Sequence, residues 1–234
     1  MKTFTFRIIG CLLLLVCLFS FSASALSIRG DILWDDQPLS FLLIVENSRY
    51  VLRIENQQKQ LMRVLADMET EELLIIDDMM EEYASVKSKQ IISVVSLLAL
   101  GRVIGVEENW LQGEPVNFFQ TGEKKVYDPF GECLQLRVND TITGMYWSFQ
   151  LDNLFLPIIN PLLQKLIHDG IRFPFWESIA KMKGFIVANE KEQKVVYRLI
   201  EVGEIPLDWQ KEIQHDNYEQ KEWVDFLSPF KAGK

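Results

Sequence analysis

The sequence contains few of the residues on which enzymes most often depend. Only three cysteines and two histidines occur among 234 residues. The sequence has no glycine-rich phosphate loop, no Gly-x-Ser-x-Gly, no His-Glu-x-x-His and no Cys-x-x-Cys. These absences argue against the common motif-defined nucleotide-binding, hydrolytic and zinc enzymes. We therefore expect no enzymatic activity, no cofactor and no metal site.

Cysteine is also too scarce to build a disulfide framework. Cys11 and Cys17 lie near the N-terminus, so a processed chain that has lost this segment keeps only Cys133. Cys133 begins the apolar pattern Cys133–Val138, and we expect it to be a buried small hydrophobe and not a reactive thiol. The core alone must then hold the fold together.

Positive charge is in short supply as well. The chain has 24 Lys+Arg against 33 Asp+Glu. Residues 26–234 hold 22 of these bases and all 33 acids, which gives them a net charge of −11. Such a surface repels phosphates and anionic lipid headgroups. The charge argues against nucleic-acid partners, and any lipid would be carried inside, away from the acidic exterior.

The N-terminal segment has the three parts of a secretory signal. Lys2 and Arg7 precede the uncharged run 8–21, and Ala23-Ser24-Ala25 follows it. This order predicts a signal peptide over residues 1–25, with cleavage after Ala25 and secretion of the mature protein. The alternative is an uncleaved N-terminal helix that anchors the protein, because about 20 apolar residues can span a bilayer.

Short extended runs separated by polar turns fill both halves of the mature chain. Strands of 5 to 7 residues separated by polar turns of 2 to 5 residues indicate antiparallel meanders. Asp128-Pro129-Phe130-Gly131 is a strong turn sequence between two of them. We count about nine strands. The runs lie at 41–46, 50–55, 61–66, 73–76, 83–86, 126–127, 133–138, 143–150, 184–188 and 195–202.

Two segments have helical spacing of apolar residues. The first runs from Ser88 to Leu100, with Gly101 as the expected stop, and the second runs from Pro157 to Ile167. A third helix is expected over 207–214, followed by a charged tail in which Trp223 and Phe226 could dock. Together the elements predict an α+β fold that is mainly β.

The titratable residues have structural interpretations. His168 stands at the expected end of the second helix, where a histidine usually serves as a cap. Neighbouring residues in a strand point to opposite faces, so adjacent acids do not form a facing catalytic pair, and we expect them in solvated turns and edges. The acid pairs lie at 35–36, 71–72, 77–78, 81–82 and 107–108.

Some apolar runs exceed a simple alternation. The runs 41–45, 73–76 and 155–159 offer apolar side chains on both faces of a strand or all around a helix. One interpretation is ordinary core between a sheet and its helices. The other is a lipid-sized cavity enclosed by a curved sheet and the helix that begins at Pro157, because ligand pockets are mostly apolar and need few polar groups.

The order of these elements resembles that of the LolA-like outer-membrane lipoprotein-sorting superfamily. The similarity spans most of residues 45–210, whereas residues 88–125 have no counterpart. The segments that carry it are Arg53-Ile54-Glu55, Leu61-Met62-Arg63-Val64, Glu72 to Tyr83, Gly131-Glu132-Cys133-Leu134, Trp147 followed by Leu156-Pro157, and Glu204-Ile205-Pro206-Leu207.

The resemblance implies a single domain over residues 26–234. Its expected form is a curved antiparallel sheet, or incomplete barrel, with helices covering the concave face. The protein would be periplasmic and not an enzyme, and it would bind acyl chains, lipid or lipoproteins as a carrier or outer-membrane sorting factor. A carrier of this superfamily uses an arginine near the cavity mouth, but neither Arg53 nor Arg63 aligns clearly with it.

The predicted ligand site combines a helical lid with strand walls, and its partner is an apolar ligand or the acyl chains of a lipoprotein. The lid residues are Ile158, Leu162, Leu163 and Leu166, and the wall residues are Tyr50, Leu52, Ile54 and Trp147.

Two other functions remain open. One is a cell-envelope structural or interaction protein with a filled core and no ligand, which uses an exposed edge or the helix around Ile91 to Leu98 to meet an envelope protein. The other is an esterase-like hydrolase, which requires a serine or carboxylate beside His168 or His215.

Overall fold

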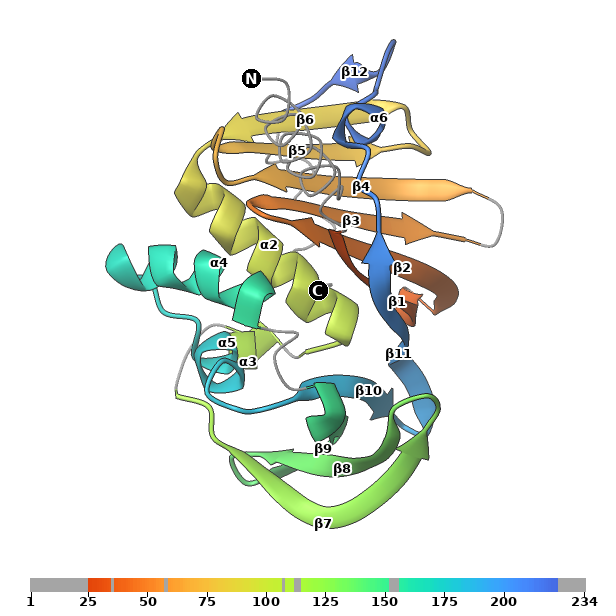
Figure 1. Cartoon of the computed structure of the whole chain (residues 1–234), viewed down its shortest axis with the longest axis vertical. Helices are drawn as coiled ribbons and strands as arrows, with labels where there is room; N and C mark the ends of the chain where they lie inside the picture. Colours follow the sequence, from red (N-terminus) through yellow and green to blue (C-terminus); the bar gives the residue numbers. More distant parts are fainter. Residues whose placement is uncertain are drawn as a thin grey trace, which may run out of the picture.

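The computed structural model describes residues 25–34, 36–56, 59–106, 108–111, 115–151 and 156–222. Within them, twelve strands form one curved sheet, and the larger helices lie on its concave side (Figure 1). The strands are β1 (Ala25–Trp34), β2 (Gln37–Glu46), β3 (Arg49–Glu55), β4 (Gln60–Asp67), β5 (Glu72–Asp77), β6 (Glu82–Lys87), β7 (Phe118–Tyr127), β8 (Gly131–Val138), β9 (Thr141–Ser148), β10 (Phe185–Lys191), β11 (Lys194–Ile205) and β12 (Glu219–Gln220). The helices are α2 (Lys89–Ile104), α3 (Glu108–Leu111), the 3-10 turn η1 (Phe149–Leu151), α4 (Leu156–His168), α5 (Pro174–Ile179) and α6 (Trp209–Glu212).

Two antiparallel meanders join at the middle of the sheet. β1 to β6 follow one another in space, as do β7 to β11, and β11 pairs with β1 to connect the two halves. The order is β12-β6-β5-β4-β3-β2-β1-β11-β10-β9-β8-β7, and β12 alone runs parallel to its neighbour, β6. Helices α2 and α3 lie in the connection between the two meanders, and α4 and α5 lie in the connection from β9 to β10.

The predicted fold class, mainly β with a curved antiparallel sheet, is confirmed. The strand count was too low, because β1 and most of β7 were missed and β12 is too short to detect. Tight turns lie where acid pairs were expected, since Asp36, Glu71 and Glu81 all have positive φ. Cys133 is fully buried, as predicted.

Helix α2 is longer than predicted. Gly101 does not end it, and the helix continues to Ile104 before Gly105 adopts the left-handed conformation with φ of 72°. Gly101 instead permits a close contact with α3, because a Cβ at this position would lie 2.7 Å from a methyl carbon of Leu111. Packing therefore explains this glycine, and the helix stop is four residues later.

Helix α4 matches the predicted segment, and it packs mainly on α2. The predicted C-terminal helix is shorter than expected, because only residues 209–212 are helical. The signal-peptide and anchor predictions lie outside the described residues, as do Trp223 and Phe226. Among the described helices, none is both long and apolar enough to cross a membrane.

Apolar side chains gather on both faces of the β1–β6 half. The larger cluster fills the concave side beneath α2 and α4 and continues into the β7–β11 half. A smaller cluster lies on the opposite, convex face and includes Leu42, Ile44 and Val51. Residues 206–220, which we call the C-terminal strap, cover this second cluster with Leu207, Trp209, Ile213 and Tyr218. Apolar runs on both faces of the strands thus reflect two cores.

Candidate functional site

The eight predicted ligand-site residues are all buried in the concave cluster. Alternation along β3 places Tyr50, Leu52 and Ile54 on this face, and each is at most 5% exposed. Trp147 comes from β9 in the other half of the sheet. The four predicted lid residues, Ile158, Leu162, Leu163 and Leu166, are buried on α4.

The structure does not bring these residues into one site. Tyr50 and Leu52 border one small cavity, whereas Ile158 borders another. Trp147 lines neither of them, and its indole N–H donates a hydrogen bond to the carbonyl oxygen of Lys183 at 2.7 Å. Gly184 allows this approach, because a Cβ there would lie 2.4 Å from the indole nitrogen. Trp147 is therefore a core residue of the β7–β11 half.

The helix that borders the cavity beside Tyr50 and Leu52 is α2 and not α4. Ser96, Ala99 and Leu100 of α2 border the same cavity as Tyr50 and Leu52. Periodicity gives little indication of this role, since α2 is apolar on almost all sides and no single buried face stands out. The structure explains this composition, because one side of α2 faces the sheet and another faces α4.

Two small apolar cavities lie between α2 and the sheet, each with a volume of about 20 Å³. The two cavities are neighbours, because Leu43 of β2 and Leu100 of α2 line both of them. A volume of this size is close to that of a single water molecule. Each of these two cavities is thus nearly filled by the side chains around it, and neither has room for an acyl chain. The cavities are lined by Leu43, Tyr50, Leu52, Val64, Ala66, Ser96, Ala99 and Leu100 in one case, and by Ile28, Phe41, Leu43, Leu100, Val103, Ile104, Ile158, Phe185 and Tyr197 in the other.

Two hydroxyl groups in this interior have no protein hydrogen-bond partner among the described residues. They are Tyr50 Oη on β3 and Ser93 Oγ on α2, three residues before Ser96. Burial raises the pKa of Tyr50 to about 12. A buried hydroxyl without a partner costs about 1 to 3 kcal/mol. The contact between the first half of α2 and the sheet is therefore largely apolar, and the hydroxyl groups of Tyr50 and Ser93 remain without a hydrogen-bond partner among the described residues.

The C-terminal half of α2 is anchored to its surroundings. The side-chain amide of Asn189 donates to the carbonyl oxygens of Ile104 at 2.9 Å and Gly105 at 3.0 Å. The indole N–H of Trp176 donates to the carbonyl oxygen of Leu97 at 3.1 Å, and Leu111 packs against Gly101. These contacts hold the helix to β10, α5 and α3.

The N-terminal end of α2 is held by weaker contacts. Ser88 caps it, with Oγ accepting from the backbone N–H of Ile91 at 3.4 Å. Lys89 forms an ion pair with Glu71 at 3.0 Å, and both side chains are solvent-exposed. Exposed ion pairs contribute at most about 1 kcal/mol. The polar contacts of this end are therefore weaker than those of the C-terminal half, although Ile92 and Val95 are buried and α2 begins two residues after the end of β6.

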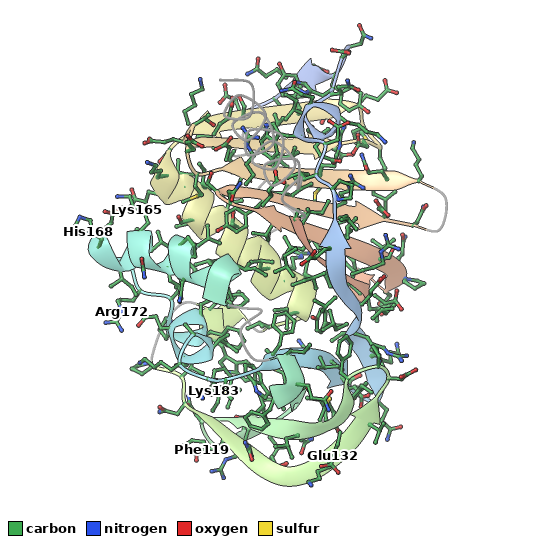
Figure 2. All side chains as sticks on the ribbon, in the orientation of Figure 1. Phe119, Glu132, Lys165, His168, Arg172 and Lys183 are labelled. Carbon is green, nitrogen blue, oxygen red and sulfur yellow. The ribbon has the colours of Figure 1, made fainter. Side chains whose placement is uncertain are left out.

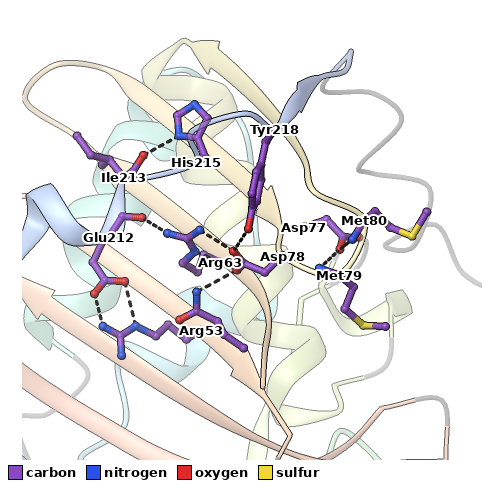
Figure 3. Close-up of polar contacts among 11 residues, drawn as sticks. Arg53, Arg63, Asp77, Asp78, Met79, Met80, Glu212, Ile213, His215 and Tyr218 are labelled. Carbon is purple, nitrogen blue, oxygen red and sulfur yellow. Dashed lines mark hydrogen bonds and ion pairs between the residues drawn. The ribbon is translucent and has the colours of Figure 1, made fainter. Parts of the chain in front are cut away.

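Arg53 and Arg63 lie on the convex face, away from the concave interior. Figure 3 shows both in a charged network with the C-terminal strap. Arg53 binds the carboxylate of Glu212 through Nε at 2.9 Å and through Nη2, and Arg63 donates to the Glu212 carbonyl oxygen. Arg63 also forms two hydrogen bonds with Asp78, at 3.0 and 2.6 Å. Both arginines thus attach the strap to the sheet, and neither reaches the two cavities.

The remainder of the strap continues this attachment. The Tyr218 hydroxyl donates to Asp78 at 3.2 Å, and Arg49 stacks over the Trp209 ring at 5.0 Å while forming an ion pair with Asp67. Burial opposes ionisation of Asp67, but the Thr70 N–H and the Arg49 guanidinium stabilise its charged form and lower its pKa. This network was not predicted from the sequence, although Arg49, Val51 and Arg53 occupy every second position of β3 and therefore lie on the same face of the strand.

Neither histidine is part of a catalytic arrangement in the described residues. Figure 2 shows His168 at the end of α4, directed away from the sheet. His215 contacts the Tyr83 ring, and its Nδ1 is 2.6 Å from the Ile213 carbonyl oxygen. Ser85 lines the same pocket of about 310 Å³ as His215, but no hydrogen bond joins them. No group of three or more metal-ligating side chains occurs in these parts of the chain.

An open hollow of about 750 Å³ lies beside β1, β2 and β11. Asp31, Ser40 and Arg198 are among its lining residues. The Ser40 hydroxyl donates to the Glu55 carbonyl oxygen at 3.3 Å, and no histidine lines this hollow. Its described lining combines polar, charged and apolar side chains and contains no recognisable catalytic set.

Comparisons with known proteins do not identify a family. No protein-family model matches the sequence, and no curated protein matches it. The chain is similar to a crystal structure of an uncharacterized conserved protein from Thermus thermophilus, with a TM-score of 0.42 and 8% sequence identity. The alignment covers 86% of this chain and 91% of that one. This likeness supplies neither a ligand nor an activity.

Proposed function

We propose that this protein is a secreted, periplasmic, non-enzymatic binding protein for acyl chains, lipid or the acyl chains of a lipoprotein. The ligand occupies the concave interior after the first half of α2 has moved away from the sheet. The observation that carries the proposal is the pair of apolar cavities on either side of Leu43 and Leu100. The sequence resemblance to the LolA-like superfamily suggests the same class of ligand.

The uneven anchoring of α2 supports a hinged opening. Asn189 and Trp176 hold its C-terminal half through hydrogen bonds to main-chain carbonyls. The first half begins at Lys89, whose ion pair with Glu71 is exposed. Separation of the first half would uncover apolar side chains of β4, β5 and β6 and would open the cavity that Ser96 shares with Tyr50 and Leu52 of β3. An acyl chain that replaces the helix there would keep this surface out of water, which is the main source of binding free energy for such ligands.

Solvent extraction of the purified protein tests this proposal. The full chain would be produced in a bacterial host that processes its N-terminal segment, and extracts would be analysed by mass spectrometry. We expect acyl-containing molecules in about one equivalent per protein. A protein that carries no co-purified lipid and also fails to bind an added apolar dye would contradict the proposal.

A second candidate function is an envelope interaction protein with a filled core. The small volume of the two cavities favours it, because neither has room for an acyl chain. The edge strand β7 then offers a surface for the partner, and Phe119 on it is 47% exposed (Figure 2).

Leu43→Ala separates these two functions. Truncation joins the two cavities and costs about 2 to 5 kcal/mol in either case. A carrier would then bind an apolar dye more tightly than wild type does. An interaction protein would lose stability alone, and it would bind no dye before or after the substitution.

A further inference from the structure

Two buried tyrosines border the two cavities, and they differ in one respect. Tyr197 on β11 donates its hydroxyl hydrogen bond to the Ile186 carbonyl oxygen at 3.2 Å. Tyr50 on β3 is 4% exposed, and its hydroxyl has no protein partner among the described residues. In the closed protein the Tyr50 hydroxyl therefore gains little that a phenylalanine would not also provide, and it bears the cost of burial.

Among the described residues, no charged side chain borders either cavity. The lining residues are apolar apart from the two tyrosines and Ser96. Three arginines on β3 and β4, Arg49, Arg53 and Arg63, face the convex side and are paired with Asp67, Glu212 and Asp78. An ion without a counter-charge is strongly disfavoured in such a medium. The described lining thus offers a hydrogen-bond donor for a neutral polar group and no counter-charge for a carboxylate.

We propose that Tyr50 is the polar contact for an uncharged carbonyl group of the ligand, so that the site takes acyl esters or amides and excludes free fatty-acid anions. This inference rests on the proposed acyl-binding function and specifies its ligand class. The phenol donates its proton to the carbonyl oxygen, while the chain lies along the apolar wall that Leu43, Leu52 and Val64 form. A phenol is protonated at neutral pH, as a donor must be, and burial raises the pKa of Tyr50 further, to about 12.

Displacement of an apolar fluorescent dye from the full chain tests the inference. The probes are methyl myristate, myristate at pH 8 and a hydrocarbon of the same length. The variants are Tyr50→Phe and, as the matched control, Tyr197→Phe, which removes a hydroxyl that already has a partner.

We expect wild type to bind methyl myristate about tenfold more tightly than the hydrocarbon and at least about tenfold more tightly than myristate. Tyr50→Phe should lose the preference for the ester over the hydrocarbon while binding the hydrocarbon as wild type does. Tyr197→Phe should keep the preference. Without ligand, the melting temperature should rise by about 2 to 4 °C in Tyr50→Phe and fall in Tyr197→Phe.

Three results would overturn the inference. Equal ester preference in wild type and Tyr50→Phe would show that Tyr50 does not contact the carbonyl, while the acyl-binding function would stand. Tighter binding of myristate than of its methyl ester would show that a cationic side chain, and not a neutral donor, binds the polar end of the ligand. Failure of every probe to displace or bind would overturn the inference together with the proposed function.

Discussion

Arg53 and Arg63 are direct cross-strand neighbours on β3 and β4, and Glu212 of the strap contacts both. Two like charges side by side on a sheet repel each other. Here the Glu212 carboxylate binds Arg53, its carbonyl oxygen accepts from Arg63, and Asp78 neutralises Arg63. The two arginines therefore attach the strap to the convex face of the sheet through Glu212 (Figure 3).

Replacing Glu212 with Gln should lower the free energy of unfolding by about 1.5 to 3 kcal/mol, the range for hydrogen bonds to charged groups. The reason is that Glu212 is almost fully buried, and its loss leaves Arg53 without its main partner. Urea denaturation measures the change. The control is Glu219→Gln, since Glu219 is exposed and its carboxylate pairs with Lys221 at the surface. Equal effects of the two substitutions would show that the network does not hold the strap.

Asn189→Ala should loosen the C-terminal end of α2. The substitution removes both hydrogen bonds to the carbonyl oxygens of Ile104 and Gly105, with an expected loss of about 1 to 3 kcal/mol. Hydrogen exchange should accelerate in α2 more than in α4. Unchanged protection of α2 would contradict the view that this end is its anchor.

Sequence patterns identified antiparallel strands and two helices because alternation along a strand and spacing along a helix are local properties, whereas the curvature of the sheet and its helical cover were implied by the resemblance. Tyr50, Leu52 and Ile54 were correctly placed on one buried face for this reason. The patterns could not tell which helix covers that face. Gly101 also misled the prediction, because its contact with Leu111 depends on how α3 returns to pack on α2.

The convex face shows the limit of local patterns most clearly. Arg53 and Glu212 lie 159 residues apart, so no periodicity relates them. Asp78 was expected in a solvated turn as one of an acid pair, and it is instead a partly buried partner of Arg63. Only the folded arrangement of the strap on β3 and β4 brings these charges together.

Alkaline pH should destabilise the protein partly through Tyr50. Its pKa is raised to about 12 in the folded protein, whereas the unfolded chain has the ordinary value of about 10. Stability from this group is full below pH 10 and falls by about 1.4 kcal/mol per unit as the pH rises towards 12, because the unfolded chain loses its proton first. The unfolding free energy of Tyr50→Phe should fall less steeply over that range. Parallel pH profiles would contradict this assignment.

Leu162→Ala should cost about 2 to 5 kcal/mol, since Leu162 is fully buried in the layer of α4 on α2. Ile167 on the same helix is 49% exposed, and Ile167→Ala should change stability by less than about 0.5 kcal/mol. Guanidinium denaturation of both variants measures the difference. Similar small losses at both positions would show that α4 is not packed as described.

Ligand entry, as we propose it, requires the first half of α2 to leave the sheet. Ala66 on β4 and Ser96 on α2 border the same small cavity, so a disulfide between cysteines at these two positions would link the helix to the sheet. In a Cys133→Ala background, loss of free thiols on oxidation would report that the disulfide has closed.

The decisive measurement is binding of an apolar dye or methyl myristate by this Ala66→Cys/Ser96→Cys protein before and after oxidation. We predict binding in the reduced protein, its loss on oxidation and its return on reduction, while Ser96→Cys alone binds under both conditions. Equal binding by the reduced and the disulfide-locked protein would contradict entry beneath α2.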